Sequence, residues 1–310
     1  MKLIESKAEY ISQEEGLEGI YKQIELAGRT AYHSLDKITP DSAKSFVDRM
    51  IKSKHGAALE HGTVYLKVPM EHSNIVYKYE RNQYSKVGNT YDGIAGDWRF
   101  YPITTNLRVL VENNWLDDLQ YLCSPTEFHE KRYTMRFTCS RAIAQELTRH
   151  RVFSFLMESQ RYINYSKERH GGEINYIMPS WYLRANVTQQ KAFMHIIRDA
   201  ESYYMALLGK WDDKKPDRRF KIGFKDNPLT PQQARDVLPN ATKTELIMTG
   251  FASDWRFFFD LRYYGKTGKP HPDMELLASK ARSEFMKAGL WDSIMTYPTK
   301  FNKHDTERKD

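Results

Sequence analysis

Apolar residues recur at helical spacing in several stretches of the chain, and most of these stretches open with a recognisable helix start. Ser12 with Glu15 forms a capping-box pattern ahead of one such stretch. Thr39–Pro40 places a cap residue and then a proline ahead of a second, which runs to Ile51. Helices are also predicted over 106–122, over 189–208 with Gly209 as the stop, over 230–239 and over 242–265.

Alternation of polar and apolar residues marks fewer stretches, and these are the predicted strands. GTVYLKV at 62–68 alternates, 132–139 is rich in β-forming residues, and 174–178 is a third candidate. The order of elements differs from a regular βαβ alternation, so we expect an α+β fold with an antiparallel or mixed sheet. The polar segments 79–100 and 210–229 look irregular, and the tail 300–310 is expected to fray.

Composition narrows the class of protein. The 310 residues are 40% hydrophobic and 28% charged, the balance of a soluble globular protein. The N-terminal segment carries Glu5 and Glu9 where a signal peptide needs an apolar core. No apolar run approaches the roughly 20 residues that span a bilayer. Two cysteines without a CxxC motif exclude a disulfide scaffold and argue against structural zinc. We expect a reduced, cytoplasmic protein with no membrane contact.

The charge balance points to anionic partners. A formal net charge of +7 favours nucleotides, phosphates or nucleic acid, without choosing among them. Several common sites are missing from the sequence: there is no GxGxxG turn, FHEKR at 128–132 is not HExxH, and no histidine pair has metal-ligand spacing. YYGKTGKP at 263–270 lacks the spacing of a P-loop and is predicted to be a helix-ending turn. Neither Cys123 nor Cys139 stands in a nucleophile context.

The densest set of anion-binding side chains lies in TRHRVFSFLMESQRY at 148–162. A helix is predicted to start near Ser140, which puts the RHR triplet, 149–151, at its C-terminal end, where cations stabilise the helix dipole. The apolar run that follows is expected to draw the triplet towards the interior, where arginines need partners. Phosphate is a natural partner for a guanidinium, and Ser159 and Arg161 follow beyond the run. The stretch therefore predicts a pocket for more than one anionic group.

The triplet followed after seven residues by Ser159 reproduces the RHR-x7-S pattern of the flavin-dependent thymidylate synthases. Three further stretches resemble segments of that family: HGAALEH at 55–61, QQARDVLP at 232–239 and SDWRFFFDLR at 253–262. The four stretches occur in the family's order and span most of residues 25–285. The resemblance implies a central, mostly antiparallel sheet flanked by helices, in a single catalytic domain that here covers residues 1–310.

The resemblance also implies a chemistry. This family converts dUMP to dTMP, with 5,10-methylenetetrahydrofolate as the carbon donor, reduced FAD as the hydride donor and NADPH as the reductant. Its members bind FAD without a Rossmann turn and need no cysteine nucleophile, which agrees with the missing GxGxxG and the unremarkable cysteines. They are homotetramers with active sites at subunit contacts.

Site residues are carried over from the family by position. Arg149, His150, Arg151, His55 and Glu60 are expected at FAD, and Glu146, Arg149, Ser159, Gln160, Arg161 and Arg235 at dUMP. The catalytic set is expected to be Ser159, Arg161 and Arg262, with Arg262 favouring ionisation of uracil N3, because a cation stabilises a developing anion. His55 can equally be a structural histidine, and Arg262 a helix-end cation.

Three positions depart from the family pattern. Met157 stands where many members have Glu or Gln, Phe257 where many have His or Asn, and Glu146 where some have Gln. The first two bring hydrogen bonding to the flavin ring into question and raise a second hypothesis, a retained fold with an altered substrate. A third hypothesis, from the net charge, is a basic nucleic-acid-binding protein, although 40 acidic residues and scattered basic ones weigh against it. Tyr162, Trp255 and Phe258 are predicted to lie in the core rather than to stack on a ligand.

Overall fold

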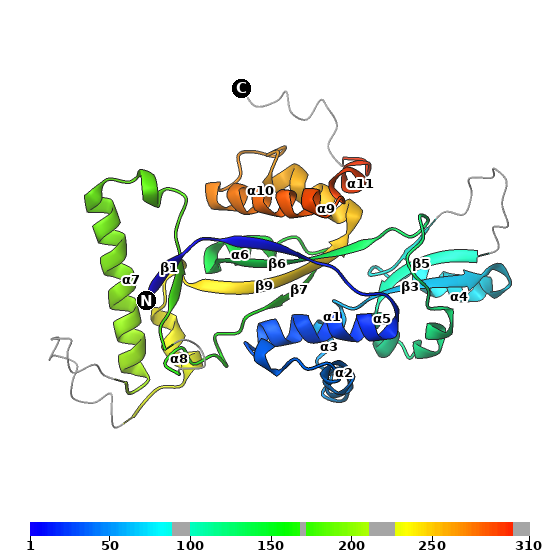
Figure 1. The fold of residues 1–310 in the computed structure, drawn as a ribbon, viewed down its shortest axis with the longest axis horizontal. Coiled ribbons are helices and arrows are strands. Elements are labelled where there is room, and N and C mark those ends of the chain that lie inside the picture. The colour runs from blue at the N-terminus through cyan, green and yellow to red at the C-terminus, as the bar shows by residue number, and fades with distance from the viewer. Residues whose placement is uncertain (89–99, 168–171, 211–226, 300–310) are drawn as a thin grey trace.

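A four-stranded antiparallel sheet organises the structure, a computed structural model that describes residues 1–88, 100–167, 172–210 and 227–299 (Figure 1). Its strand order is β2 (Lys7–Ile11), β6 (Arg132–Ser140), β9 (Lys243–Phe251) and β7 (Ser154–Met157). Nine residue pairs align β6 with β9, from Arg132 opposite Phe251 to Ser140 opposite Lys243. The expected α+β class with a mostly antiparallel sheet is confirmed.

Helices cover both faces of this sheet (Figure 1). On one face lie α9 (Ala252–Arg262), α10 (Pro272–Lys287) and α11 (Trp291–Met295), and on the other lie α1 (Gly16–Ala31), α2 (Ser42–Lys52) and α3 (Gly56–Leu59). Because both faces are covered, β9 is buried along nearly its whole length.

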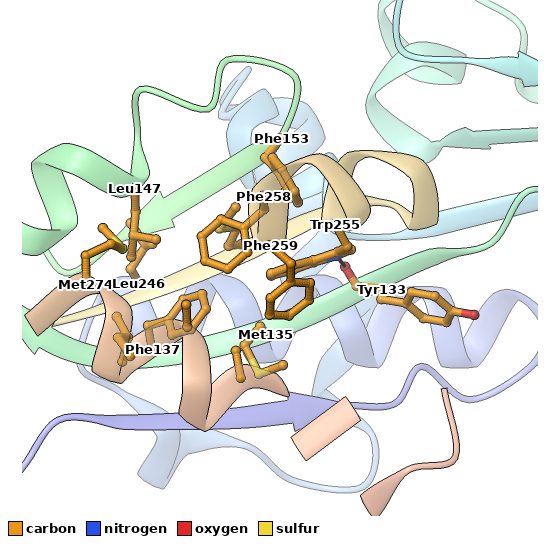
Figure 2. Packing of buried hydrophobic residues seen from close by; sticks show 14 of the residues in the cluster. Tyr133, Met135, Phe137, Leu147, Phe153, Leu246, Trp255, Phe258, Phe259 and Met274 are labelled. Carbon is orange, nitrogen blue, oxygen red and sulfur yellow. Dashed lines mark hydrogen bonds between the residues drawn. The ribbon is translucent and has the colours of Figure 1, made fainter. Parts of the chain in front are cut away.

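An aromatic core fills the space between the sheet and α9–α10 (Figure 2). Trp255 and Phe258 of α9 are fully buried there, as predicted. The indole Nε1 of Trp255 donates to the carbonyl oxygen of Tyr133 at 3.1 Å, so the ring brings its polar atom to a partner on β6. Phe153, just before β7, packs edge-on against Trp255 with 4.9 Å between ring centroids. The core thus fixes the start of β7 relative to α9.

Two smaller units flank the central sheet. A three-stranded sheet orders β3 (Thr63–Pro69), β5 (Phe100–Asn106) and β4 (Lys86–Val87), with α4 (Ser73–Glu80) and α5 (Leu107–Glu112) against it. A parallel pair joins β1 (Lys2–Ile4) to β8 (Asn175–Ile177), near α7 (Val187–Leu207) and α8 (Pro231–Ala234). Within the described ranges the remaining helix is α6 (Arg141–Leu147), and short 3-10 turns are Leu35–Lys37, Met70–His72, Leu116–Tyr121, Tyr182–Arg184 and Arg235–Val237.

Many local predictions are confirmed. The three predicted strands are β3, β6 and β8, and the helix expected after Ser140 is α6, whose cap is the Ser140 hydroxyl, 3.3 Å from the amide of Ile143. Gly209 follows α7 at a φ of 76°, as a helix stop requires. The turn predicted at 263–270 follows the end of α9.

Other predictions of secondary structure are wrong. The helix expected over 242–265 is the strand β9 followed by α9. The helix expected over 106–122 breaks after α5 at Asn113, and Asn114 has a left-handed φ of 58°. The first two helices begin at Gly16 and Ser42, later than their predicted caps.

Some predictions fall where the structure gives no description. The tail 300–310 lies outside the described residues, as do 89–99 and 211–226 within the segments expected to be irregular. Among the described residues, no helix combines the length and the apolar character needed to cross a membrane.

Candidate functional site

The RHR triplet lies in the turn that joins α6 to β7. The helix ends at Leu147, so the triplet follows it rather than forming its last turn. Of the three side chains only His150 is buried, and Arg149 and Arg151 are exposed. Neither arginine pairs with a carboxylate in the described part of the chain. The prediction that the apolar run draws both arginines into the interior of their own subunit is therefore wrong.

His150 instead faces Arg262. Its Nε2 accepts a hydrogen bond from Nε of Arg262 at 3.0 Å, so that nitrogen carries no proton. Burial, and then the charge of Arg262, lower the pKa of His150 to about 4. The imidazole is therefore neutral at physiological pH. It holds the guanidinium in one orientation and places no second positive charge beside it.

Glu146 completes a cluster with these two residues. Arg262 is the last residue of α9, and its Nη1 lies 3.5 Å from Oε2 of Glu146 on α6. Arg262 is 22% exposed and Glu146 31%, so the pair lies at the protein surface rather than in the core. The structure thus brings together three predicted site residues, Glu146, His150 and Arg262, which we call the Arg262 cluster.

A second group of predicted residues forms a tight turn after β7. The carbonyl oxygen of Ser159 accepts from the amides of Tyr162 and Ile163, both at 3.2 Å, and its amide donates to the carbonyl of Ala31 at 3.4 Å. We call residues 159–163 the Ser159 turn. Arg161 is exposed on this turn, and its guanidinium carbon lies 5.5 Å from the ring centroid of Tyr162.

Two side chains of the Ser159 turn differ in burial from what their chemistry suggests. Gln160 is buried, 8% exposed, and its side chain faces the hydroxyl of Tyr165, but its Nε2 completes no hydrogen bond of good geometry among the described residues. Tyr162 is 65% exposed, so the prediction that it lies in the core is wrong. A bound ligand or a second subunit would give the buried amide donor an acceptor and would cover the exposed aromatic ring.

The Arg262 cluster and the Ser159 turn lie at opposite ends of β7. A strand advances about 3.3 Å per residue, so the four residues of β7 separate them by roughly 10 Å or more. A ligand that touched both sets in one chain would have to span at least that distance. Arg235, on the 3-10 turn Arg235–Val237, is half-buried and makes no hydrogen bond or ion pair to either set within the described ranges.

His55 lies on the side of the Ser159 turn. Its Nδ1 is 3.3 Å from the hydroxyl of Tyr32, and Tyr32 directly follows Ala31, the residue that binds the amide of Ser159. A surface hollow of about 680 Å³ opens here, and its lining includes Arg29, Tyr32, Phe46, Arg49, Met50 and His55. The hollow combines aromatic surface with cations, a combination suited to a planar anionic ligand.

Glu60 already has partners within its own chain. Its carboxylate forms an ion pair with Arg108, and its backbone carbonyl accepts from Nη1 of Arg132 at 3.0 Å. Arg132 also donates from Nη2 to the hydroxyl of Ser154 at 3.1 Å, which ties the HGAALEH segment to β7. Arg132 was not predicted as a site residue, because an arginine at the start of a strand gives no signal in the sequence.

His61 belongs to the same buried region. It is fully buried, with Nδ1 2.8 Å from the hydroxyl of Thr249 and with Nε2 unpartnered among the described residues. Burial, and then the charge of Arg132, lower the pKa of His61 to about 3. Burial likewise lowers the pKa of Arg132 to about 10. The charges of Glu60 and Asp254 act on Arg132 but offset only part of its desolvation.

The two cysteines carry no sign of nucleophilic activation. Cys139 is buried in β6, and burial raises the pKa of its thiol to about 12. Burial also raises the pKa of the Cys123 thiol. Among the described residues, no group of three or more His, Cys, Asp or Glu side chains is arranged to hold a metal ion.

Comparisons with known proteins find relatives of this chain. The model of the family described as thymidylate synthase complementing protein matches residues 104–288. Proteins named flavin-dependent thymidylate synthase from Corynebacterium glutamicum and Corynebacterium efficiens are 31% and 32% identical to it over 137 and 139 residues. These alignments cover 44% and 45% of this chain and 49% and 50% of the relatives. The chain therefore spans about half the length of the curated relatives it matches.

Solved structures give a weaker likeness. The UMP/dUMP methylase PolB from Streptomyces cacaoi, bound with 5-Br dUMP, aligns with 96% of this chain and 98% of its own. The identity is 14% and the TM-score 0.43, which is too distant to support a structural argument.

Proposed function

Because the chain belongs to the thymidylate synthase complementing protein family, we propose that it is a flavin-dependent thymidylate synthase. The reaction is the reductive methylation of dUMP to dTMP, with 5,10-methylenetetrahydrofolate as carbon donor and NADPH as reductant. One observation carries the proposal: the family match over 104–288 includes every predicted site residue except His55 and Glu60.

The exposed arginines fit a flavin dinucleotide. Arg149 and Arg151 are both exposed and without a carboxylate partner in the described chain, so a diphosphate is a suitable counter-charge. We assign FAD to these two residues, with His55 and its hollow as the surface for an aromatic portion of the cofactor. Glu60 is kept as a hydrogen-bond acceptor for this ligand through the carboxylate oxygen that Arg108 does not bind. When bound and reduced, the flavin supplies the hydride that the reaction needs.

The Ser159 turn fits the nucleotide. Ser159 and Arg161 offer a hydroxyl and a guanidinium to an anion, and Gln160 offers the buried amide donor that completes no hydrogen bond within the described ranges. Arg235 would reach the same dUMP as a further cation. Because the Ser159 turn and the Arg262 cluster lie at opposite ends of β7, we propose that each site takes them from different subunits of a homotetramer.

Arg262 acts on the pyrimidine in this proposal. A cation held beside uracil N3 favours the ionised base and raises electron density on the ring, most strongly where water is excluded. The neutral His150 orients Arg262, and Glu146 fixes its other edge. In this proposal His150 therefore has two roles: it binds FAD, as expected from the family, and it orients Arg262. A cytoplasmic location, with dUMP and NADPH at hand, belongs to this proposal.

The test combines a spectrum with an isotope assay. The purified, FAD-reconstituted protein is expected to show a flavin absorption band and to release tritium from [5-³H]dUMP only when both NADPH and methylenetetrahydrofolate are present. Omitting each co-substrate in turn is the control. No flavin retained and no tritium released would end the proposal, whereas flavin retained with turnover of another pyrimidine nucleotide would support an altered substrate, as the Met157 and Phe257 departures suggest.

A further inference from the structure

A buried carboxylate lies directly before the Ser159 turn and has no place in the chemistry above. Glu158 follows β7 and is only 1% exposed. A carboxylate at that depth is costly unless donors surround it. Its side chain accordingly accepts hydrogen bonds from β9 and from the chain just beyond the Ser159 turn.

Two donors come from β9. Oε2 of Glu158 accepts from Nζ of Lys243 at 3.0 Å and from the backbone amide of Glu245 at 3.1 Å. The backbone of Glu158 extends the same attachment, because its amide donates to the carbonyl of Glu245 at 2.8 Å. Its carbonyl accepts from Nη1 of Arg141 at 3.2 Å. Glu158 is thus fixed to the sheet through its main chain and its side chain together.

The other side-chain donor within the described residues comes from just beyond the Ser159 turn. The hydroxyl of Tyr165 donates to Oε1 of Glu158 at 3.3 Å, and both groups are buried. Between these two residues the chain runs out and back through the Ser159 turn. One carboxylate therefore closes the base of the segment that carries Ser159, Gln160 and Arg161.

We propose that Glu158 is a positioning residue, which holds the Ser159 turn in the conformation that receives the anionic nucleotide. The Ser159 turn is closed internally by amide hydrogen bonds to the carbonyl and hydroxyl of Ser159, but these bonds do not orient the turn relative to the sheet. Besides the bond from its amide to Ala31, the attachment at Glu158 sets that orientation, and with it the position of the exposed Arg161. Glu158 acts through these neighbours and does not touch the ligand. The identity of that ligand as dUMP rests on the proposed function, but the fastening of the turn does not.

Hydrogen exchange on the full-length protein directly tests whether Glu158 holds the Ser159 turn in place. In Glu158→Gln, the amides of Tyr162 and Ile163, which bond to the Ser159 carbonyl, are expected to exchange at least about tenfold faster than in the wild type. Lys243 keeps the carboxylate of Glu245 at 2.9 Å in this variant, so its charge is not left alone. Glu245→Gln is the matched control, because it removes the other carboxylate of Lys243 and leaves the Ser159 turn untouched; exchange at these amides should change less than twofold.

Tyr165→Phe provides a milder second variant. It deletes only the hydroxyl that joins the two ends of the segment and keeps the ring in its core. The same amides should exchange faster than in the wild type and more slowly than in Glu158→Gln. Unchanged exchange in both variants would overturn the inference.

Ligand binding separates a positioning role from a merely structural one. Calorimetric titration with dUMP should give a Kd raised at least about fivefold in Glu158→Gln, while flavin per subunit and the far-ultraviolet circular dichroism stay as in the wild type. A loosened turn with an unchanged Kd would also overturn the positioning role. If the wild-type protein bound no dUMP and had no synthase activity, the proposed function would fail, and the exchange data would still decide whether Glu158 fastens the turn.

Discussion

Arg262 lies between a neutral acceptor and a carboxylate, and both are within reach of its guanidinium. The bond to His150 orients the group, while Glu146, at 3.5 Å and partly exposed, offsets only part of its charge. We predict that Arg262→Ala lowers kcat about a hundredfold or more, because the cation beside the developing anion is lost. Flavin content should stay within about twofold, as measured by absorbance after gel filtration. Equal losses of turnover and flavin would show that Arg262 serves the cofactor instead.

The same contact predicts a change in histidine ionisation. The charge of Arg262 is the second cause, after burial, of the low pKa of His150. Removing that charge in Arg262→Ala should raise the pKa of His150 above about 4 while burial keeps it below the ordinary value near 6.5. Titration of the imidazole by NMR, with His150→Gln to assign the resonance, measures the shift. An unchanged pKa would mean that burial alone sets it.

His61 makes folding stability depend on pH. Its pKa is about 3 in the folded protein and near 6.5 when unfolded, so the unfolded chain binds the extra proton first as pH falls. The stability contributed by neutral His61 is complete above pH 6.5 and is lost as pH falls towards 3. Between pH 6.5 and 5 this linkage amounts to about 1.5 kcal/mol.

The variant His61→Gln isolates that contribution. Urea unfolding at pH 6.5 and at pH 5 should show a smaller loss of stability in His61→Gln than in the wild type. His195→Gln is the control, because the His195 side chain is 76% exposed. The same pH dependence of stability in the wild type and both variants would show that His61 does not make this contribution.

At the scale of elements, the contact between β9 and the start of β7 is unusually close. A Cβ added at Gly250 would come within 2.3 Å of a ring carbon of Phe153, and this ring packs edge-on against Trp255. We predict that Gly250→Ala lowers the free energy of unfolding by about 1–3 kcal/mol, since neither ring has room to move. Urea denaturation gives the value.

A matched glycine tests this explanation. A Cβ at Gly56 would meet only the flexible ends of Arg108 and Glu112, at 2.8 and 2.9 Å, and Gly56 opens α3. Gly56→Ala should therefore change stability by less than about 0.5 kcal/mol. If both variants lost similar stability, the crowding at Phe153 would not be the cause.

At the scale of elements, alternation or a high content of β-forming residues made β3 and β6 predictable, although β6 is buried on both faces, whereas β9 offered neither signal. The strand β3 alternates, and α7 has apolar residues at helical spacing with a stop at Gly209, so both were found; the cap at Asn186 places its start two residues before the prediction. In β9 both faces are buried, the alternation disappears, and Thr242 with Glu245 imitates a capping box. The true start of α9 is capped through Asp254, whose carboxylate accepts from the amide of Phe251 at 3.2 Å.

The candidate site was predictable residue by residue but not in its arrangement. Matching segments located Glu146, His150 and Arg262, and the fold brings them together. Nothing in the sequence says that a four-residue strand separates them from Ser159. Glu158 and Arg132 were missed because their partners, Lys243 and the Glu60 carbonyl, are distant in the chain and no local pattern marks such a contact.

For the whole molecule, the separation along β7 predicts that inactive subunits can complement one another. Arg151→Ala and Ser159→Ala should each be inactive alone. Co-expressed in equal amounts, they should regain about a quarter of wild-type activity, because a site that draws the two residues from different subunits finds both intact in one case in four. Differently tagged subunits, purified through both tags and assayed for tritium release, give the measurement. Activity no higher than in either parent would place both residues in the same subunit's site.

The state of the two thiols bears on how such an enzyme could be inhibited. With burial raising the pKa of both Cys123 and Cys139, little thiolate exists at neutral pH to attack an electrophile. Alkylating warheads aimed at a reactive sulfur should consequently spare this protein while disabling enzymes that depend on one. Selective compounds would need to compete for its arginines instead, as non-hydrolysable phosphate mimics do.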